Sequence, residues 1–267
     1  MQTKEEIFFN YCSINDDKIP LFSWKKFPSE YFKPKHSHAR GQFIFSENEF
    51  LKVVTEDAFW YIPHSQTIWI PPYVEHETLS TDKFPCIFTQ IDISQCHRFS
   101  SKPQILTTSL IVNELVKRSL EFGLSYKLGS HEYRLVQVLL DELSALPIAD
   151  YHLKMPKDER LINVSKYLLE HPAMKHGIET LQKIAGMSKR NLERLFEKDT
   201  GITIGEWIRH QKMLLAMEKL SSGESVSCVA LDLGYKSISS FIETFKATTG
   251  KTPGVFMSQN NIHTAAL

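Results

Sequence analysis

Short runs of apolar residues alternate with polar segments between residues 20 and 95. These runs are rich in β-branched and aromatic side chains, which favour strands. Turn-forming pairs such as Glu56-Asp57 and Pro71-Pro72 separate some of them. The runs are 42–46 (QFIFS), 50–55 (FLKVVT), 59–62 (FWYI), 67–70 (TIWI) and 85–91 (PCIFTQI). Several short strands at this spacing predict a β-sandwich or a small barrel.

Helical spacing replaces this alternation near Pro103 and predicts helices over residues 105–122 and 131–146. In the second of these, one stripe is formed by Leu135, Val138, Leu139, Leu143 and Leu146. The stripe is expected either to pack against the β-rich part or to form a dimer seam. It covers fewer than two heptads, so it does not predict a coiled coil. Residues 148–156 lack a clear period and predict a linker.

A helix-turn-helix pattern occurs twice after an amphipathic helix predicted for residues 158–170. Each copy places apolar residues and a closing glycine at matching offsets, and the turn of the second copy is one residue longer. The copies are Leu181, Gly186, Met187, Ser188, Leu192, Phe196, Gly201 and Val229, Gly234, Tyr235, Ser237, Phe241, Phe245, Gly250. Between them, Thr203 and Glu206 predict a capping box that begins a long helix ending near Leu220. Two such units in one domain indicate that the domain reads DNA.

The outer face of each second helix carries the candidate DNA contacts. Ser188 is expected to cap its helix by accepting a hydrogen bond from the backbone N–H of Asn191. Arginine at such a helix end can bind guanine, and glutamate can accept from cytosine. The candidates are Lys189, Arg190, Glu193 and Arg194 in the first unit, and Lys236, Ile238, Ser239, Glu243 and Lys246 in the second. The second face is poorer in base-reading side chains, and its lysines are expected to contact phosphates.

Length, charge and cysteine content refine this interpretation only slightly. The 267 residues favour two domains, and the formal net charge is zero. From Lys157 onward there are 15 Lys+Arg and 12 Asp+Glu residues, a modest excess that supports DNA binding weakly. The four cysteines form no C-x-x-C pair, so neither a structural zinc site nor a disulfide framework is expected. No apolar run reaches membrane-spanning length and no signal-peptide pattern occurs, which predicts a cytoplasmic protein without membrane contact.

Residues 158–257 resemble the DNA-binding domain of AraC/XylS-type transcriptional regulators. The residues that carry the resemblance are GMSKRNLERLF at 186–196, TG at 200–201, Trp207, Ala216, Leu220, VALDLGYKSISSF at 229–241, F-K at 245–246 and TGKTPG at 249–254. The resemblance implies two helix-turn-helix units that enter successive major grooves. It assigns base reading to Arg190, Glu193, Arg194, Ile238, Ser239 and Glu243. The chain departs from the family pattern at Gln182, Lys212 and Glu243.

Histidines in the N-terminal part form the other constellation that could carry chemistry. His36 and His38 share a face if they lie on one strand. The surrounding sequence resembles the cupin-type sensor domain that precedes AraC-type DNA-binding domains. Metal-binding cupins use three histidines and a carboxylate, and the equivalent positions here are His36, His38, Gln42 and His76. Glutamine is a weak ligand, so these side chains are expected to bind either a divalent metal or, more in keeping with their chemistry, no metal at all.

The same region could hold a small-molecule effector. Its candidate contacts are His38, Arg40, Gln42, Trp60, Trp69 and His76, with the aromatic residues equally able to be core. Arg40 could pair with an acidic or nitro-bearing effector. An enzyme would need the metal and an open coordination position.

The sequence thus predicts an α+β multidomain protein. Residues 1–147 form a cupin-like barrel with transmission or dimerisation helices at about 105–146. Residues 148–156 form a linker, 157–257 the all-α DNA-binding domain with two helix-turn-helix units, and 258–267 a flexible tail. The predicted function is a non-enzymatic transcriptional regulator that binds double-stranded promoter DNA and senses a small molecule. Its other expected partners are a second copy of the chain and, for an activator, RNA polymerase.

Two alternatives remain open at this stage. One is a cupin metalloenzyme with an accessory DNA-binding domain. The other is a constitutive DNA-binding protein whose barrel serves only dimerisation.

Overall fold

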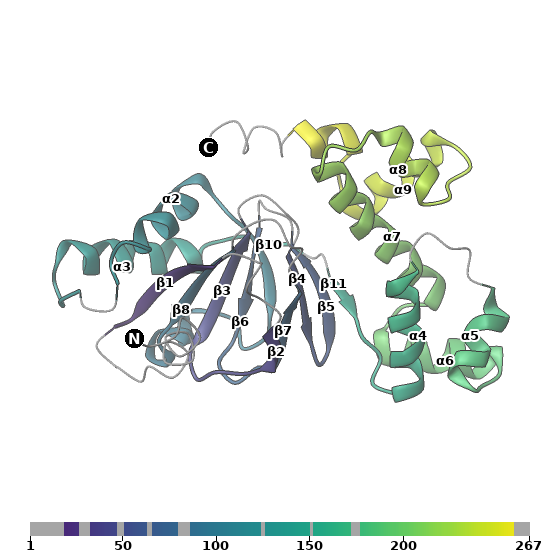
Figure 1. The fold of residues 1–267 in the computed structure, drawn as a ribbon, viewed down its shortest axis with the longest axis horizontal. Helices are drawn as coiled ribbons and strands as arrows, with labels where there is room; N and C mark the ends of the chain where they lie inside the picture. The colour runs from purple at the N-terminus through teal and green to yellow at the C-terminus, as the bar shows by residue number, and fades with distance from the viewer. Residues whose placement is uncertain are drawn as a thin grey trace. The chain divides into compact units, whose positions relative to one another are not determined.

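A computed structural model describes residues 19–26, 33–46, 51–62, 66–79, 86–123, 126–149, 152–171 and 177–258 (Figure 1). The chain divides into two compact units. The first comprises Met1–Thr55 and Ile62–Tyr151, and the second comprises Glu56–Tyr61 and His152–Leu267. Several predicted positions lie outside the described residues, namely Phe50, Pro85, 150–151 of the linker and 259–267 of the tail.

The described part of the first unit contains two antiparallel sheets. The larger has the strand order β1-β8-β3-β6-β9-β10, and the smaller has the order β4-β7-β2. The larger sheet comprises β1 (Leu21–Lys26), β8 (Cys86–Ile91), β3 (Gly41–Ser46), β6 (Gln66–Ile70), β9 (Gln104–Thr107) and β10 (Ile148–Ala149). The smaller comprises β4 (Leu51–Thr55), β7 (His76–Leu79) and β2 (Lys33–His36). This two-sheet architecture confirms the predicted β-rich N-terminal domain, and its cupin-like character stays a prediction.

One face of the larger sheet packs against two helices, α2 (Leu110–Ser119) and α3 (His131–Ser144). Phe43 and Trp69 are paired on neighbouring strands, and both belong to this core. Gly41 is required here, because a Cβ atom at this position would lie only 2.0 Å from the Trp69 ring. A short 3-10 helix, η2 (Ile93–Arg98), follows β8. Side chains alternate along a strand, so Gln42, the neighbour of Phe43, lies on the face of the sheet opposite to the helices.

The helical prediction for residues 105–122 is wrong at its start. Residues 105–107 belong to strand β9, which pairs with both β6 and β10, and the helix begins only at Leu110. Ile105 and Leu106 are both buried, because the strand lies between two others and its apolar run serves two faces. A buried strand and a short helix turn cannot be separated by periodicity alone.

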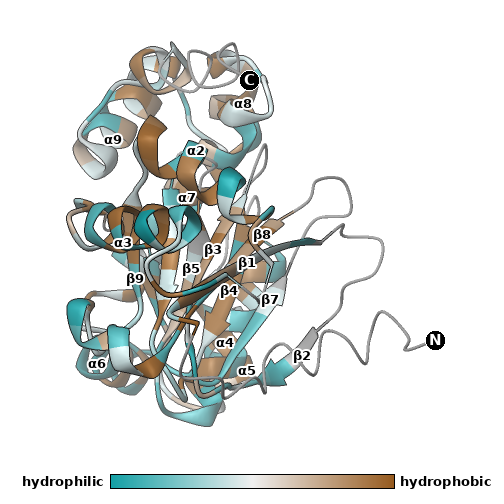
Figure 2. Cartoon of the chain, turned by 90° about the vertical axis from the view of Figure 1, so that its left-hand side faces the viewer, coloured by the Kyte–Doolittle hydropathy of each residue, from teal (hydrophilic) through white to brown (hydrophobic). Residues whose placement is uncertain are grey.

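The stripe predicted on the second helix is buried only in part: Leu139 and Leu143 are buried, Leu135 and Leu146 are half-buried, and Val138 is exposed. The buried residues of α3 are Val136, Leu139, Leu140 and Leu143, whereas Val138 is 45% exposed. Figure 2 shows hydrophobic and hydrophilic residues on different sides of this helix. The buried side joins the core formed with α2 and the sheet, so packing within the unit is the interpretation that holds.

In its described residues, the second unit is helical apart from one strand pair. Strand β5 (Ala58–Ile62) pairs with β11 (His152–Lys154). The helices are α4 (Glu159–Glu170), α5 (Ile178–Ala185), α6 (Lys189–Thr200), α7 (Ile204–Ser221), α8 (Val226–Asp232) and α9 (Ile238–Thr249). The Trp207 indole N–H donates to the Lys154 carbonyl oxygen at 2.8 Å, so α7 is held to β11. Strands β10 and β11 therefore lie within the stretch predicted as a linker.

Helix α7 begins and ends as its sequence predicts. Thr203 accepts from the Glu206 backbone N–H, and the Glu206 carboxylate accepts from the Thr203 backbone N–H, which is a complete capping box. The chain does not end its regular structure at Pro253, since residues 253–258 form another helical turn. Phe256 of this turn is buried against Phe245. Among the described residues, no helix combines the length and the apolar composition needed to cross a bilayer.

Candidate nucleic-acid interface and histidine cluster

The two helix-turn-helix units close their first helices in the same way. Gly186 has a φ of 60°, and the Met187 N–H donates to the Gln182 carbonyl oxygen at 3.2 Å. Gly234 has a φ of 76°, and the Tyr235 N–H donates to the Ala230 carbonyl oxygen at 3.0 Å. In both units the donor N–H comes five residues after the acceptor carbonyl, which is the hydrogen bond that accompanies a left-handed glycine at a helix end. The longer turn of the second copy is confirmed, because α9 begins four residues after its glycine and α6 begins three after its own.

The N-termini of the two recognition helices, α6 and α9, are capped differently. Ser237 accepts from the Ser240 backbone N–H at 3.2 Å, as expected of an N-cap. The predicted bond between Ser188 and the Asn191 N–H is wrong, because the Ser188 side chain makes no cap hydrogen bond. Ser188 has the extended backbone of an N-cap but is exposed, so water can satisfy the first amides of α6.

The outer face of α6 presents its predicted contacts to solvent. Leu192 and Phe196 are fully buried, which fixes the orientation of the helix. The four candidates, Lys189, Arg190, Glu193 and Arg194, are all exposed. Lys189 and Glu193 lie 3.8 Å apart, in a solvent-exposed pair that contributes little to stability. Both arginines are thus accessible, and their contact with DNA stays a prediction.

The outer face of α9 is exposed but chemically weaker. Phe241 and Phe245 are fully buried, and Ile238, Ser239 and Glu243 face outward. Lys236 and Lys246 are exposed near the two ends of the helix. An isoleucine can contact a thymine methyl and a serine can bond several bases, so weaker base discrimination than at α6 stays the prediction for this face.

Two lysines of α7 connect this helix to residues at or near the ends of α8, and the sequence indicated neither contact. The Lys212 ammonium donates to the Leu233 carbonyl oxygen at 2.8 Å, at the end of α8. The Lys219 ammonium bonds Glu224 and Asp232 at 3.0 and 2.8 Å. The hydrogen bond to Asp232 raises the pKa of Lys219. Lys212 stood out in the sequence only as a departure from the family pattern.

Asn191 is a further candidate that sequence reasoning missed. It is exposed in the first turn of α6, next to Arg190. Asparagine can bind adenine through two hydrogen bonds. Its type and position could have indicated this role.

The three predicted histidines come together in the first unit. His36 on β2 pairs in register with His76 on β7, and their ring centroids lie 4.3 Å apart. His38 follows β2, and its ring lies 5.1 Å from that of His76. One ligand nitrogen from each of the three lies within 4.8 Å of the others. His38 and His76 are buried and His36 is half-buried, so the cluster is largely shielded from water.

Hydrogen bonds define which ring nitrogens face this cluster. His38 Nδ1–H donates to the Arg40 carbonyl oxygen at 2.6 Å, and His76 Nδ1–H donates to the Val74 carbonyl oxygen at 2.9 Å. A carbonyl oxygen only accepts, so Nδ1 carries the proton in both rings, and Nε2 of a neutral His76 ring is a lone-pair atom. His38 Nε2, in contrast, faces a second acceptor. The Gln42 amide oxygen lies 3.3 Å from His38 Nε2. Neutral imidazole nitrogens suit zinc, nickel or copper, and backbone carbonyls that orient ligand histidines are typical of metal sites.

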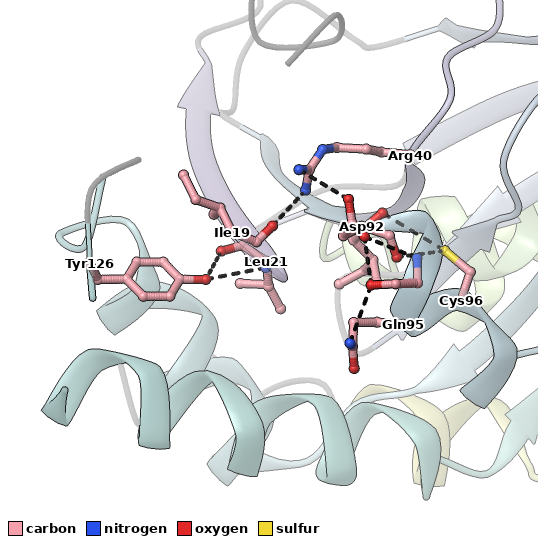
Figure 3. Close-up of polar contacts among 9 residues, drawn as sticks. Ile19, Leu21, Arg40, Asp92, Gln95, Cys96 and Tyr126 are labelled. Atoms are coloured by element: carbon pink, nitrogen blue, oxygen red, sulfur yellow. Dashed lines mark hydrogen bonds and ion pairs between the residues drawn. The ribbon is translucent and has the colours of Figure 1, made fainter. Parts of the chain in front are cut away.

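Arg40 is engaged elsewhere in the same unit (Figure 3). Its guanidinium lies 3.3 Å from the Asp92 carboxylate and donates to the Ile19 carbonyl oxygen at 3.0 Å. It also lies over the Phe22 ring. Only 2% of Arg40 is exposed. The structure therefore gives Arg40 a buried ion pair, and its contact with an effector stays a prediction.

Cys96 lies beside this ion pair and is half-buried. Its thiol donates to the Asp92 carbonyl oxygen at 3.3 Å. Burial raises the pKa of the thiol to about 11, so it stays protonated at neutral pH.

The two tryptophans predicted as effector contacts are not brought to the histidines. Trp69 lies on the helix-facing side of the sheet, between Phe43 and Phe99, and its indole N–H donates to the Ser100 carbonyl oxygen. Trp60 belongs to the second unit and stacks on His152 with ring centroids 4.7 Å apart. The residues that do lie together are His36, His38, Gln42 and His76.

Comparisons with known proteins agree with the helix-turn-helix geometry. A family model described as a helix-turn-helix domain matches residues 181–259. The HTH-type transcriptional regulator NimR of Escherichia coli (strain K12) is 29% identical over 230 residues, which cover 86% of this chain and 84% of NimR. The regulatory protein SoxS of Salmonella typhimurium (strain LT2) is 35% identical over 89 residues, which cover 33% of this chain and 83% of SoxS.

Among solved structures, ToxT from Vibrio cholerae O395 matches over 90% of this chain and 98% of its own, with 12% identity and a TM-score of 0.39. The curated relatives NimR and SoxS are named as regulators, not enzymes. Two helix-turn-helix units on either side of one connecting helix, together with the matches to the helix-turn-helix model, to NimR and to SoxS, show that the chain belongs to the AraC/XylS family of DNA-binding transcriptional regulators.

Proposed function

We propose that this regulator reads a promoter through α6 and α9 and that its first unit senses a small molecule. The observation that carries the DNA-reading part is the exposure of all nine predicted contacts over two buried helix cores. Arg190, Glu193 and Arg194 read bases in one major groove. Ile238, Ser239 and Glu243 make weaker base contacts in the next groove, while Lys236 and Lys246 contact phosphates.

The sensing part rests on the polar cluster of the first unit. His38, Gln42 and His76 are buried side by side among apolar strands. Buried polar groups gathered in this way are costly unless they serve structure or binding. Ligand acts by binding one arrangement of the protein better than another, which changes the affinity for DNA.

A homodimer and, for an activator, contact with RNA polymerase belong to the same proposal. Two copies would place four helix-turn-helix units on two half-sites and raise the effective affinity. The leucine-rich side of α3 is buried in the core of its own unit, so a dimer uses another surface. Sedimentation at several protein concentrations distinguishes a dimer from a monomer.

The experiment selects genomic fragments with the purified full-length protein and then screens a library of small metabolites for changes in affinity for the selected site. We expect a discrete site with two boxes about one helical turn apart. We also expect at least one compound to change the affinity five-fold or more. Binding that ignores sequence would overturn the DNA-reading part, and an affinity that no compound changes would overturn the sensing part.

A divalent metal at the three histidines is a second candidate, favoured by their converging nitrogens. The Nε2 atoms of His38 and His76 would hold the ion with His36, and Gln42 would add a weak oxygen ligand. Such an ion would supply a fixed positive charge to the sensor. Metal analysis after expression in zinc or nickel tests this. We expect one ion per chain, lost in His38→Ala and kept in His97→Ala, an exposed histidine of η2. Equal metal content in both variants and the parent would exclude the site.

A further inference from the structure

Gln90 on β8 has an unusual environment for a polar side chain. It is 0% exposed, and neither its amide nitrogen nor its amide oxygen has a hydrogen-bond partner among the described residues. A buried amide group left in this state is destabilising, because it has lost its hydrogen bonds to water without replacing them. Unpaired buried groups in native proteins are rare and generally mark a bound water, an ion or a ligand.

Strand register places Gln90 next to the histidine cluster. Gln42 on β3 and Gln90 on β8 are direct partners in an antiparallel pair, so both side chains lie on the same face of the sheet. This face is opposite to the one that Ile87 and Ile91 turn toward α2 and α3. Gln42 in turn contacts His38. From the register we infer that Gln42 and Gln90, on the larger sheet, add two amide side chains to the cluster of His36, His38 and His76.

The two amide side chains on this face, Gln42 and Gln90, are polar and uncharged. Arg40, which precedes β3, and Asp92, which follows β8, are charged but are paired with each other. Phe22 is the partner of Gln90 on β1, and Trp24 and Phe88 stack beside it at 5.4 Å on the same face. A charged ligand would lose its hydration here without meeting an opposite charge. A neutral ligand with apolar surface would lose little.

We propose that Gln90 is a ligand-binding residue of the sensor and that the effector is a small uncharged molecule with an amide-type edge. An amide presents a donor and an acceptor side by side, and its best complement is an N–H next to a C=O. Primary amides, lactams and ureas have this edge. Gln90 forms both hydrogen bonds, and Gln42 and His38 contact the adjacent part of the ligand. This assignment rests on the proposed sensing function of the first unit.

Two matched probe series test the charge and the edge together. They are acetamide, acetate and acetamidinium, and benzamide, benzoate and benzamidinium, each measured on the full-length protein by ligand-observed NMR and thermal shift. We expect the amides to bind at least ten-fold more tightly than their charged analogues. Acetate or amidinium probes that bind as tightly as the amides would overturn the proposal, and so would the absence of amide binding.

Two variants separate ligand binding from folding. Gln90→Leu removes the unpaired amide, so the protein is expected to stay folded with equal or higher melting temperature. It should lose amide binding ten-fold or more. Gln66→Leu is the matched control, because Gln66 is buried on the same face but opposite Thr107, at the far end of the sheet. Amide binding by Gln90→Leu equal to that of the parent would mean that Gln90 holds only an ordered water.

The outcomes distinguish this inference from the proposed function. The probe assay contains no DNA, so amide binding without any change in DNA affinity would support the ligand class and overturn sensing. A charged metabolite that changes DNA affinity equally in the parent and in Gln90→Leu would support sensing and overturn the ligand class.

Discussion

Arg190 and Lys246 are both exposed cations on recognition helices, but their chemistry separates them. Arg190 has a planar fork near the start of α6, whereas Lys246 is a point charge in the last turn of α9. Arg190→Ala is expected to cost about 1–3 kcal/mol at the selected site and to relax base preference at one position. Lys246→Ala should weaken binding to all sequences and reduce the salt slope by about one.

Lys166→Ala on the exposed side of α4 is the control for both variants. The DNA affinity of each variant is measured by titration with the selected site and with a scrambled sequence at several salt concentrations. Equal losses on the two DNAs for Arg190→Ala would contradict its base-reading role.

The Arg40–Asp92 pair illustrates how burial sets the value of a salt bridge. Asp92 is 5% exposed, and Asp92→Asn would keep a helix-capping side chain while leaving the Arg40 charge buried without its partner. We expect a loss of about 3–5 kcal/mol in unfolding free energy. Asp141 pairs with Arg98 at 2.6 Å but its side chain is 72% exposed. Asp141→Asn should therefore change the free energy by less than about 1 kcal/mol. Denaturant titration compares the two, and equal effects would contradict the role of burial.

Tyr126 makes the folding stability of the first unit depend on pH in the alkaline range. Its hydroxyl donates to the Leu21 carbonyl oxygen at 2.5 Å and accepts from the Leu21 N–H at 3.2 Å. Burial raises the pKa of Tyr126 to about 12, whereas the pKa of an unfolded tyrosine is about 10. The neutral phenol is favoured in the folded state, so its contribution is full below pH 10 and is lost as the pH rises toward 12.

Tyr126→Phe removes this titration. Unfolding free energies of the parent and the variant should therefore differ most below pH 10 and converge between pH 10 and 12. A difference that stays constant across this range would show that the hydroxyl contributes without a shifted pKa.

At the level of elements, a left-handed glycine defines each helix-turn-helix. An alanine Cβ at Gly186 would meet no atom within 4 Å, so only the backbone conformation, with φ of 60°, opposes it. Gly186→Ala should cost about 1–2 kcal/mol in the stability of the second unit. Gly205→Ala, in the first turn of α7 with equally open surroundings, should stabilise by about 0.5–1 kcal/mol. Thermal unfolding that moves in the same direction for both variants would be inconsistent with this explanation.

For the whole molecule, DNA binding depends on local charge, because the chain carries no net charge. Five cations are proposed to face DNA, namely Lys189, Arg190, Arg194, Lys236 and Lys246. These five charges, whether they bond a base or a phosphate, displace about five counterions from the DNA, which predicts a loss of affinity on the order of 100- to 1000-fold between 50 and 200 mM salt. Fluorescence anisotropy across this range measures the slope. A slope near zero would mean that these cations do not contact the phosphates.

The sequence by itself determined the helix-turn-helix units, their turn lengths, the capping box and the exposed contacts. Each of these depends on residues a few positions apart, so period, caps and glycines suffice to predict it. Only the tertiary structure decided that residues 105–107 form a strand, that Arg40 pairs with Asp92, that Trp69 faces the helices, and that Gln90 lies opposite Gln42. These features depend on which strands pair and in which register. Pairing brings together residues that are distant in the chain, and a strand buried on both faces carries no alternation to reveal it.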